Sequence, residues 1–377
     1  MVRDVMNVIF EDRRLEPIRA KVEAGERLSY DDGLTLYRSH DLLALGYMAN
    51  LVRERLHGNV TYYNVNRHIN PTDVCVANCR LCAFGKRAKD PNSYTMSLEQ
   101  VWETAGRGWQ EQITEFHIVG GLHPELNLDW FCRMLRGLKE RYPMIHLKAF
   151  TMVEIGYFAR REKISTREVL VRLRDAGMDS LPGGGAEVFS ERVRRIICDH
   201  KLTGDEWLET ARIAHELGLH SNCTMLYGQI ENEEDRVDHL VRLRALQDET
   251  NGFITFIPLA FHPDNTALSH IAKTTGFDDL KNIAVSRLML DNIPHIKAYW
   301  VMMSERIAQV AMRFGSDDID GTVVEEKIYH DAGAETSQAL RRGDLLRLIK
   351  MAGRTPVERD TLYRPVQRTE NAFTVLV

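Results

Sequence analysis

From residue 61 onward the chain alternates short apolar runs with longer amphipathic stretches, and this alternation restricts its fold more than any other feature. Each run ends in a polar or Gly-rich turn and is followed by apolar residues at helical spacing, which is typical of a buried strand leading into a helix. Strand–helix alternation predicts a parallel sheet. The predicted strands are residues 62–69, 115–119, 146–150, 180–181, 221–226, 253–259 and 296–301, with a short eighth near 318–320.

These strands recur roughly every 30 to 50 residues, which is the spacing of βα units. Seven or eight units predict an α/β fold, a (β/α)8 TIM-type barrel with an imperfect closing strand. We expect residues 1–60 to form an N-terminal helical lead-in, 61–325 the barrel, and 326–377 a C-terminal covering segment of the same globular unit. The run 354–360 is highly charged, so we expect it on the barrel surface rather than in the core.

The residues at the predicted helix ends support this reading. Ser97, Ser165 and Thr203 are each followed three positions later by Gln or Glu, which is the pattern of a capping box. Gly177 and Gly218 each stand just after a helical stretch and before a strand, where a left-handed residue commonly ends a helix.

Charge and hydropathy restrict the partners that we expect. The net charge of -5 and the pI near 6.3 give no basis for a nucleic-acid or anionic-membrane partner. No stretch approaches the ~18 apolar residues of a membrane span. The first residues show no basic region followed by an apolar run, so no secretory signal is expected. These features predict a cytoplasmic protein without a nucleic-acid or membrane partner.

Three of the six cysteines, Cys75, Cys79 and Cys82, lie in one short loop directly after the first predicted strand. That position is the C-terminal mouth of a barrel, where active sites lie. Iron–sulfur clusters normally have four thiolate ligands, so three would leave one iron of a [4Fe–4S] cluster open. An open iron can chelate the amino and carboxylate groups of S-adenosylmethionine. One electron from the cluster then breaks the sulfonium C–S bond and forms a 5′-deoxyadenosyl radical.

A zinc site with a distant fourth ligand, such as a histidine, is the alternative. Structural zinc loops usually contain paired CxxC motifs, and this sequence has no second pair. The other cysteines stand singly in helical or strand contexts and are interpreted as buried structural residues. They are Cys132, Cys198 and Cys223.

Five residues after the predicted strands are candidate contacts for the bound nucleotide. An aromatic ring beside the cysteines can pack on adenine, or can simply anchor the loop. Glycines at a strand end allow close approach of the backbone to a ligand. A carboxylate can accept bonds from ribose hydroxyls, or can instead stabilise a helix start. The candidates are Phe84, Gly120, Gly121, Glu154 and Glu187.

Two residues on the later strands are candidates for contact with the substrate. His262 follows the sixth predicted strand and can bind or transfer a proton. Lys297 lies within the seventh, where an unpaired lysine is costly, so it binds either a substrate carboxylate or an internal acid such as Asp291.

Several segments together resemble a known family. The cysteine loop resembles that of the radical S-adenosylmethionine superfamily, and further segments between about residues 60 and 365 resemble the aminofutalosine synthases of the futalosine route to menaquinone. One departure is Leu81, where the superfamily usually has an aromatic residue. The resembling segments are GGLHPEL (120–126), LKAFT (147–151), LPGGGAE (181–187), TMLYG (224–228), IPLAFHP (257–263) and DNIPHIKAYW (291–300).

This resemblance implies a specific reaction. The adenosyl radical would add to the enol-ether double bond of 3-[(1-carboxyvinyl)oxy]benzoate, and loss of CO2 or bicarbonate would give 6-amino-6-deoxyfutalosine. The resemblance also implies a low-potential electron donor such as flavodoxin or ferredoxin. By position, His68, Lys297 and Arg287 are candidate contacts for the two substrate carboxylates, with His262 as a polar or acid–base partner.

Related functions stay open at this stage. Dehypoxanthine futalosine cyclase and the deazaflavin (F0) synthases share much of the pattern. The F0-synthase pattern resembles PGTAAE at the position where this chain has PGGGAE (182–187). This difference favours similarity to the aminofutalosine synthases. An alternative of another class is a zinc-stabilised binding module.

Overall fold

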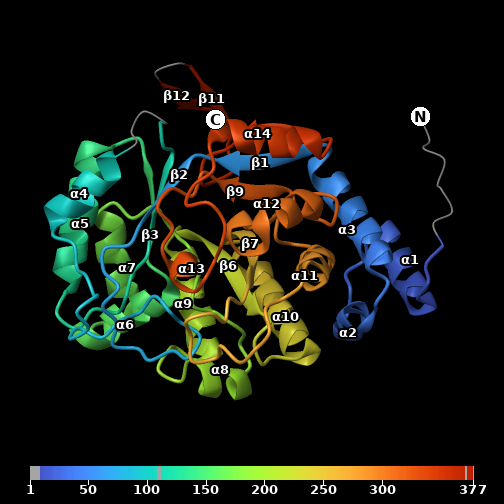
Figure 1. The fold of residues 1–377 in the computed structure, drawn as a ribbon, viewed down its shortest axis with the longest axis horizontal. Coiled ribbons are helices and arrows are strands. Elements are labelled where there is room, and N and C mark those ends of the chain that lie inside the picture. Colours follow the sequence, from blue (N-terminus) through green and yellow to red (C-terminus); the bar gives the residue numbers. More distant parts are fainter. Residues whose placement is uncertain (1–8, 108–111, 370–371, 377) are drawn as a thin grey trace.

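The computed structural model describes residues 9–107, 112–369 and 372–376, and in it helices surround a parallel sheet (Figure 1). Seven strands pair in chain order, every pair is parallel, and their inward faces enclose the core. The strands are β2 (Asn66–Ile69), β3 (Glu115–Ile118), β4 (His146–Ala149), β5 (Ser180–Leu181), β6 (His220–Tyr227), β7 (Phe253–Ala260) and β8 (His295–Ile296).

A further strand, β9 (Asp318–Gly321), closes the ring. It is joined to the end of β8 by a parallel bridge between Lys297 and Asp318, and the chain just beyond it is joined to β2 by a bridge between Arg67 and Val324. The predicted (β/α)8 barrel with a short, imperfect eighth strand is therefore confirmed. The closure is imperfect because these two junctions are single bridges rather than ladders.

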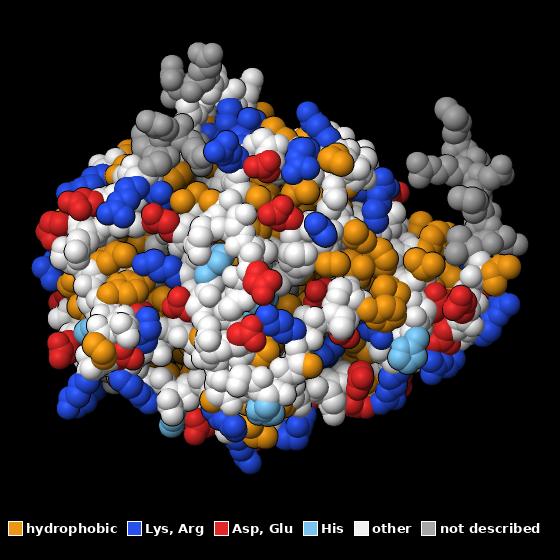
Figure 2. Space-filling view, viewed as in Figure 1, with side chains coloured by type: hydrophobic (Ala, Val, Ile, Leu, Met, Phe, Trp, Pro, Cys, Tyr) orange, Lys and Arg blue, Asp and Glu red, His pale blue; other side chains and the backbone are white. Residues whose placement is uncertain are grey.

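Helices connect the strands and cover the outside of the barrel. They are α4 (Leu98–Gly106), α5 (Leu128–Arg141), α6 (Met152–Glu162), α7 (Thr166–Asp175), α8 (Glu191–Ile197), α9 (Gly204–Glu216), α10 (Glu233–Thr250), α11 (Gly276–Met289) and α12 (Trp300–Ala311). On the face drawn in Figure 2, Lys and Arg side chains alternate with Asp and Glu, and apolar patches lie between them.

The predicted helix boundaries agree with the observed caps. Ser97 and Thr203 form complete capping boxes, whereas Ser165 accepts from the Glu168 backbone N–H without the reciprocal bond. Gly177 and Gly218 have φ of 111° and 77°, so both occupy the left-handed region expected after a helix.

Two predicted strands differ from the observed ones. The run 62–69 is two strands, because β1 (Val60–Asn64) pairs with β9 and β10 while β2 pairs with β3. The run predicted at 296–301 ends early, because the chain turns into α12 at Trp300. There the Trp300 indole Nε1 donates to the carbonyl oxygen of Gly321 at 2.9 Å, which attaches α12 to the closing strand.

The N-terminal residues form helices, as predicted, in the part of the lead-in that the structure describes; residues 1–8 lie outside it. The helices are α1 (Glu16–Ala24), α2 (Tyr30–Arg38) and α3 (Leu42–His57). They lie beside α10 and α11 on one side of the barrel (Figure 1).

The C-terminal segment lies against both ends of the barrel. Helix α13 (Ile328–Asp331) contributes Ile328 and Tyr329 to the cavity at the mouth. At the other end, the Thr361 hydroxyl donates to Glu115 on β3 at 2.7 Å. The remaining elements are α14 (Arg342–Met351), β10 (Thr355–Glu358), β11 (Val366–Arg368) and β12 (Phe373–Val375).

The prediction that residues 354–360 are too charged for the core is wrong. Arg354, Glu358, Arg359 and Asp360 are all buried. Each is paired: for example, Arg359 Nε lies 2.6 Å from Asp318 Oδ2. Arg354 contacts Glu54 at 2.8 Å, Glu358 contacts Arg368 at 2.6 Å, and Asp360 contacts Arg364 at 2.6 Å. Buried charges are tolerated when they are paired, and a local charge count does not identify the partners. Across the described ranges, no helix combines the length and the apolar character needed to cross a membrane.

Candidate active site

A cavity of about 280 Å3 opens at the C-terminal ends of the strands. Its wall contains the cysteine loop, the turns after β3, β4 and β5, inward residues of β6 and β7, and residues of the C-terminal segment. The predicted residues among its lining are His68, Cys75, Cys79, Cys82, Phe84, Gly120, Gly121, Glu154, Glu187 and His262.

The cysteine loop is held in place by backbone contacts. The Cys75 N–H donates to Lys86 O at 2.8 Å, and the Arg80 N–H donates to Ile197 O at the end of α8 at 2.9 Å. A Cβ added to Gly121 would lie 2.2 Å from Val74 O, so only glycine fits beside the loop there. The glycines after β3 therefore allow the loop to pack against the barrel.

The donor set favours a cluster over a single zinc ion. Among the described residues, the one set of three His, Cys, Asp or Glu side chains whose ligand atoms all lie within 4.8 Å is His57, His295 and Asp317, not the cysteines. A tetrahedral zinc with Zn–S bonds of about 2.3 Å requires closely grouped thiols. Three thiols spread along the wall of one cavity fit the larger [4Fe–4S] group. Burial raises the pKa of the Cys79 thiol to about 12, so this sulfur is protonated without a metal.

Glu154 caps a helix, which is one of the two roles predicted for it, and its side chain also lines the cavity. Its carboxylate caps α6 by accepting from the Thr151 N–H at 2.8 Å, and it also accepts from the Gly120 N–H at 3.2 Å while lining the cavity. Burial raises the pKa of Glu154 to about 7. Phe84 is buried and lines the same cavity. Both side chains therefore face the cavity that contains the cysteine loop.

Glu187 forms an ion pair with Lys201, a residue with no distinguishing pattern in the sequence. Lys201 Nζ lies 2.5 Å from Glu187 Oε1, and both side chains line the cavity. Burial opposes the charge of Lys201, but Glu187 holds its pKa well above the ordinary value. The pair thus places a permanent cation beside the cysteine loop.

His262 and two tyrosines form another part of the wall. His262 Nε2 lies 2.9 Å from Met302 O, an acceptor, so this nitrogen is the protonated one. Burial lowers the pKa of His262, which favours the neutral ring. Tyr299 and Tyr329 line the cavity with their rings 5.9 Å apart, edge to face. Tyr329 comes from the C-terminal segment, so that segment completes the site.

The floor of the cavity is polar. His68 on β2 and His117 on β3 pair in register, and their rings stack with centroids 4.4 Å apart and planes 4° apart. Lys148 on β4 is the register neighbour of His117 and lies 2.7 Å from Glu115. Burial would raise the pKa of Glu115, but this lysine holds it well below the ordinary value.

The buried partner of Lys297 is Asp320, not Asp291. Lys297 Nζ lies 3.3 Å from Asp320 Oδ1, and the lysine is buried outside the lining of the cavity while Asp320 belongs to it. Asp291 is partly exposed and pairs with Arg27 at 2.8 Å. The closing strand supplies the nearer acid, and only the barrel closure brings the two together.

Arg287 does not line the cavity, so the prediction that it contacts a substrate carboxylate is wrong. Its guanidinium is completely buried, lies 2.6 Å from Asp317 Oδ1, and donates to Gly315 O at 3.0 Å. Asp317 precedes β9 and His295 begins β8, so this group lies at the N-terminal end of the barrel. Arg287 lies on α11 and points into this closed end, not into the cavity.

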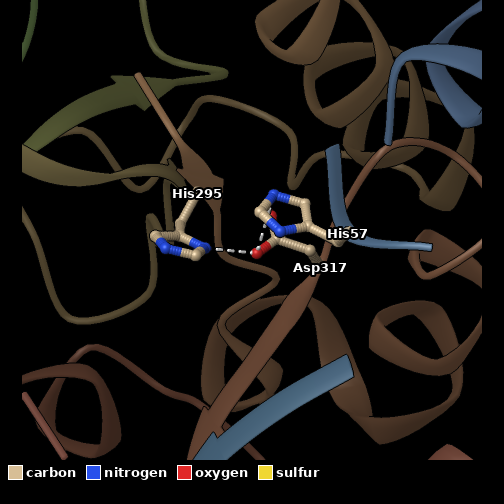
Figure 3. A group of neighbouring side chains, drawn as sticks. All are labelled: His57, His295 and Asp317. Carbon is tan, nitrogen blue, oxygen red and sulfur yellow. Dashed lines mark hydrogen bonds and ion pairs between the residues drawn. The ribbon is translucent and has the colours of Figure 1, made fainter. Parts of the chain in front are cut away.

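The group around Asp317 does not form a metal site (Figure 3). The Asp317 carboxylate accepts from His295 Nδ1 at 2.6 Å as well as from Arg287. His57 Nε2 donates to Pro294 O at 2.8 Å, so that nitrogen carries a proton. A cation would have to displace these bonds beside a buried guanidinium, which is unfavourable. The group is therefore structural.

Sequence reasoning did not single out several residues of the site. His117 and Lys148 each lie inside a predicted strand, as polar residues among apolar ones, which is the same signal that His68 and Lys297 carry. Lys201 lies in no motif or predicted strand that would indicate a functional role. The other unpredicted lining residues with polar side chains include Thr151, Thr224, Tyr299, Asp320, Glu326 and Tyr329.

Comparisons with known proteins agree with this architecture. The family model described as the radical SAM superfamily matches residues 69–243, and the one described as the CofH/MqnC C-terminal region matches residues 250–372. Methylornithine synthase has a similar fold, with a TM-score of 0.68 at 18% identity over 90% of this chain and 97% of that one. Fold, cysteine loop and family models together define a radical S-adenosylmethionine enzyme.

Curated relatives narrow the family. The chain is 48% identical to aminodeoxyfutalosine synthase of Thermus thermophilus, over 94% of this chain and 97% of the relative. It is 46% identical to that of Streptomyces coelicolor, over 94% of each. Cyclic dehypoxanthine futalosine synthase of Halalkalibacterium halodurans is 34% identical over 95% of this chain and 96% of the relative. The chain belongs to the aminodeoxyfutalosine synthase family of the radical SAM superfamily.

Proposed function

We propose that this chain is a transferase that joins the 5′-deoxyadenosyl group of S-adenosylmethionine to 3-[(1-carboxyvinyl)oxy]benzoate. The product is 6-amino-6-deoxyfutalosine, a precursor of menaquinone, and the enolpyruvyl carboxylate leaves as CO2 or bicarbonate. The observation that carries the proposal is the placement of Cys75, Cys79 and Cys82 in one cavity with a polar floor, in a chain with the family membership given above.

Cys75, Cys79 and Cys82 would hold the [4Fe–4S] cluster, and when bound it supplies the electron that cleaves the sulfonium bond of S-adenosylmethionine. An external low-potential donor such as flavodoxin or ferredoxin would provide that electron.

The chain's own residues orient the reactants and exclude water. Phe84 is placed to pack on the adenine, and Glu154 to accept bonds from the ribose hydroxyls. Lys201 is placed to attract the carboxylate of the methionine part, because its charge is fixed by Glu187. The apolar side chains of β6 and β7 keep the reacting carbon atoms in a dry region of the barrel, which protects a radical from solvent and stray hydrogen donors.

An anaerobic product assay tests the proposal. The reconstituted protein is incubated with S-adenosylmethionine, dithionite and 3-[(1-carboxyvinyl)oxy]benzoate, and the products are identified by mass spectrometry. We expect a product that contains the adenosyl group, and iron analysis of about four atoms per chain with absorption near ~400 nm. Free 5′-deoxyadenosine with a cyclised futalosine derivative would instead indicate the cyclase. A colourless protein with one tightly bound zinc would contradict the radical mechanism.

A further inference from the structure

The stacked imidazoles of His68 and His117 are the most unusual polar feature of the cavity. His68 is 7% exposed, and both rings line the floor. Within the described residues the two rings contact each other, and neither ring has a hydrogen bond to another group. His68 is buried and His117 is partly exposed to the cavity, so two polar rings that lack a partner in the described chain face the same space and are available to a ligand there.

The charges around the two rings are already balanced by ion pairs. Lys148 lies 2.7 Å from Glu115, and Lys297 lies 3.3 Å from Asp320. Burial lowers the pKa of both imidazoles and outweighs the opposite effect of nearby acids such as Glu326 and Glu115, so both rings are neutral. Each neutral ring offers one N–H donor. Two parallel rings at 4.4 Å that both line the cavity can therefore direct two in-plane donors at one acceptor group at their edges.

From this geometry we infer that His68 and His117 form a carboxylate clamp that binds the benzoate group of the substrate, with Lys148 as its positioning residue. The inference rests on the proposed function. The nucleoside is expected at the mouth beside the cysteine loop, so the vinyl carbon that accepts the adenosyl group faces the mouth. The ring carboxylate, at the other end of the substrate, then points to the floor.

Lys148 acts through its neighbours rather than by direct contact. It is buried, it does not line the cavity, and it lies beside His117 in the strand register. Its ammonium disfavours a proton on either ring, which keeps both imidazoles as neutral donors. The same charge attracts a carboxylate placed at the edges of the rings.

Substitution of each ring by phenylalanine tests the clamp, because Phe keeps the stacked ring and removes the donor. We expect His68→Phe and His117→Phe to lower kcat/KM for the full substrate by roughly 10- to 100-fold, the effect of losing a hydrogen bond to a charged group. The matched substrate is 2-phenoxyacrylate, which lacks the ring carboxylate, and its kcat/KM should change by less than about twofold. His117→Gln, which retains a donor, should restore part of the loss.

Controls distinguish a loss of carboxylate binding from a folding defect and from a loss of the cluster. His270→Phe, at an exposed histidine outside the cavity, should behave as the parent protein. Iron content should be unchanged in every variant. Equal losses for both substrates, or no loss for either, would overturn the clamp.

A binding measurement tests the clamp even if the proposed reaction is wrong. Calorimetry without reductant should show that 3-hydroxybenzoate binds the parent protein more tightly than phenol does, and that His117→Phe removes this preference. If the parent protein prefers 3-hydroxybenzoate to phenol but makes no adenosylated product, the proposed function is wrong and the carboxylate clamp is still supported. If the parent protein has no preference for the carboxylate, the clamp is wrong whatever the reaction.

Discussion

Both ends of the barrel contain buried histidines and other polar side chains, but the two ends differ in whether these side chains have hydrogen-bond partners. At the N-terminal end, His57, His295, Arg287 and Asp317 each form at least one hydrogen bond or ion pair, and Tyr363 stacks on His295 at 3.4 Å between ring centroids. At the mouth, histidines, thiols and tyrosines face a cavity, and several have no partner within the described chain. Polar clusters with satisfied bonds stabilise this fold, whereas clusters with open bonds are available for chemistry.

The largest expected effect is loss of the cluster. Cys79→Ala should reduce turnover by more than about 1,000-fold, since the electron cannot be delivered without the cluster. The variant should still fold, because the Cys79 side chain faces the cavity. Iron analysis and circular dichroism measure the two outcomes. Cys132→Ala, at a buried cysteine outside the loop, is the control and should keep its iron. Normal iron and turnover in Cys79→Ala would exclude its role as a ligand.

The second effect should be on stability rather than turnover. Asp317→Asn leaves the Arg287 guanidinium buried without a counter-charge, so we expect a loss of about 3–5 kcal/mol in the free energy of unfolding. Denaturant titration measures it. Turnover of the folded variant at low temperature should be unchanged. A specific loss of turnover without destabilisation would show that this end takes part in catalysis.

The same variant has a predicted pH dependence. Burial would raise the pKa of Asp317, but His295 and Arg287 lower it below its ordinary value. A lowered carboxyl pKa gives stability that is present at neutral pH and is lost as the pH falls through the folded-state value. The difference between parent and Asp317→Asn should therefore narrow in acid, below a pH of about 4. A constant difference down to that pH and below would contradict the ionic role.

Glu154→Gln should have opposite effects on stability and affinity. Because burial raises the pKa of Glu154 to about 7, the ionised carboxylate disfavours folding above that pH, and the penalty disappears as the pH falls toward 4.5. The variant should be stabilised by at most about 3 kcal/mol at pH 8 and little at pH 5. Its affinity for S-adenosylmethionine, measured by equilibrium binding, should fall. Unchanged affinity would show that Glu154 is only a helix cap.

The smallest effect is expected at an exposed pair. Arg195 and Glu191 on α8 are 2.6 Å apart and more than two-thirds exposed. Arg195→Ala should change stability by less than about 0.5 kcal/mol. A change of several kcal/mol in thermal or chemical unfolding would mean that this helix has an unrecognised contact.

Some features of the fold could be predicted from the sequence, and others depend on contacts between distant residues. The strand order and several helix caps could be predicted, because they depend on local periodicity and on single residues such as Ser97, Thr203 and Gly177. The early end of β8 could not, because it depends on the contact of the Trp300 indole with Gly321, 21 residues away. Burial of the charged run 354–360 depends on partners such as Asp318 and Glu54, which lie far away in the sequence.

The sequence by itself determined the barrel, the family, and the position of Cys75, Cys79 and Cys82 at the mouth of the barrel. Short local patterns of residues are sufficient to predict each of these. The tertiary structure alone decided which polar residues are open and which are partnered. Arg287 and Lys297 resemble His117 and Lys148 as isolated polar residues, yet only His117 lines the cavity. The physical reason is that a buried polar group is defined by its neighbours in space, and barrel closure brings those neighbours together from distant strands.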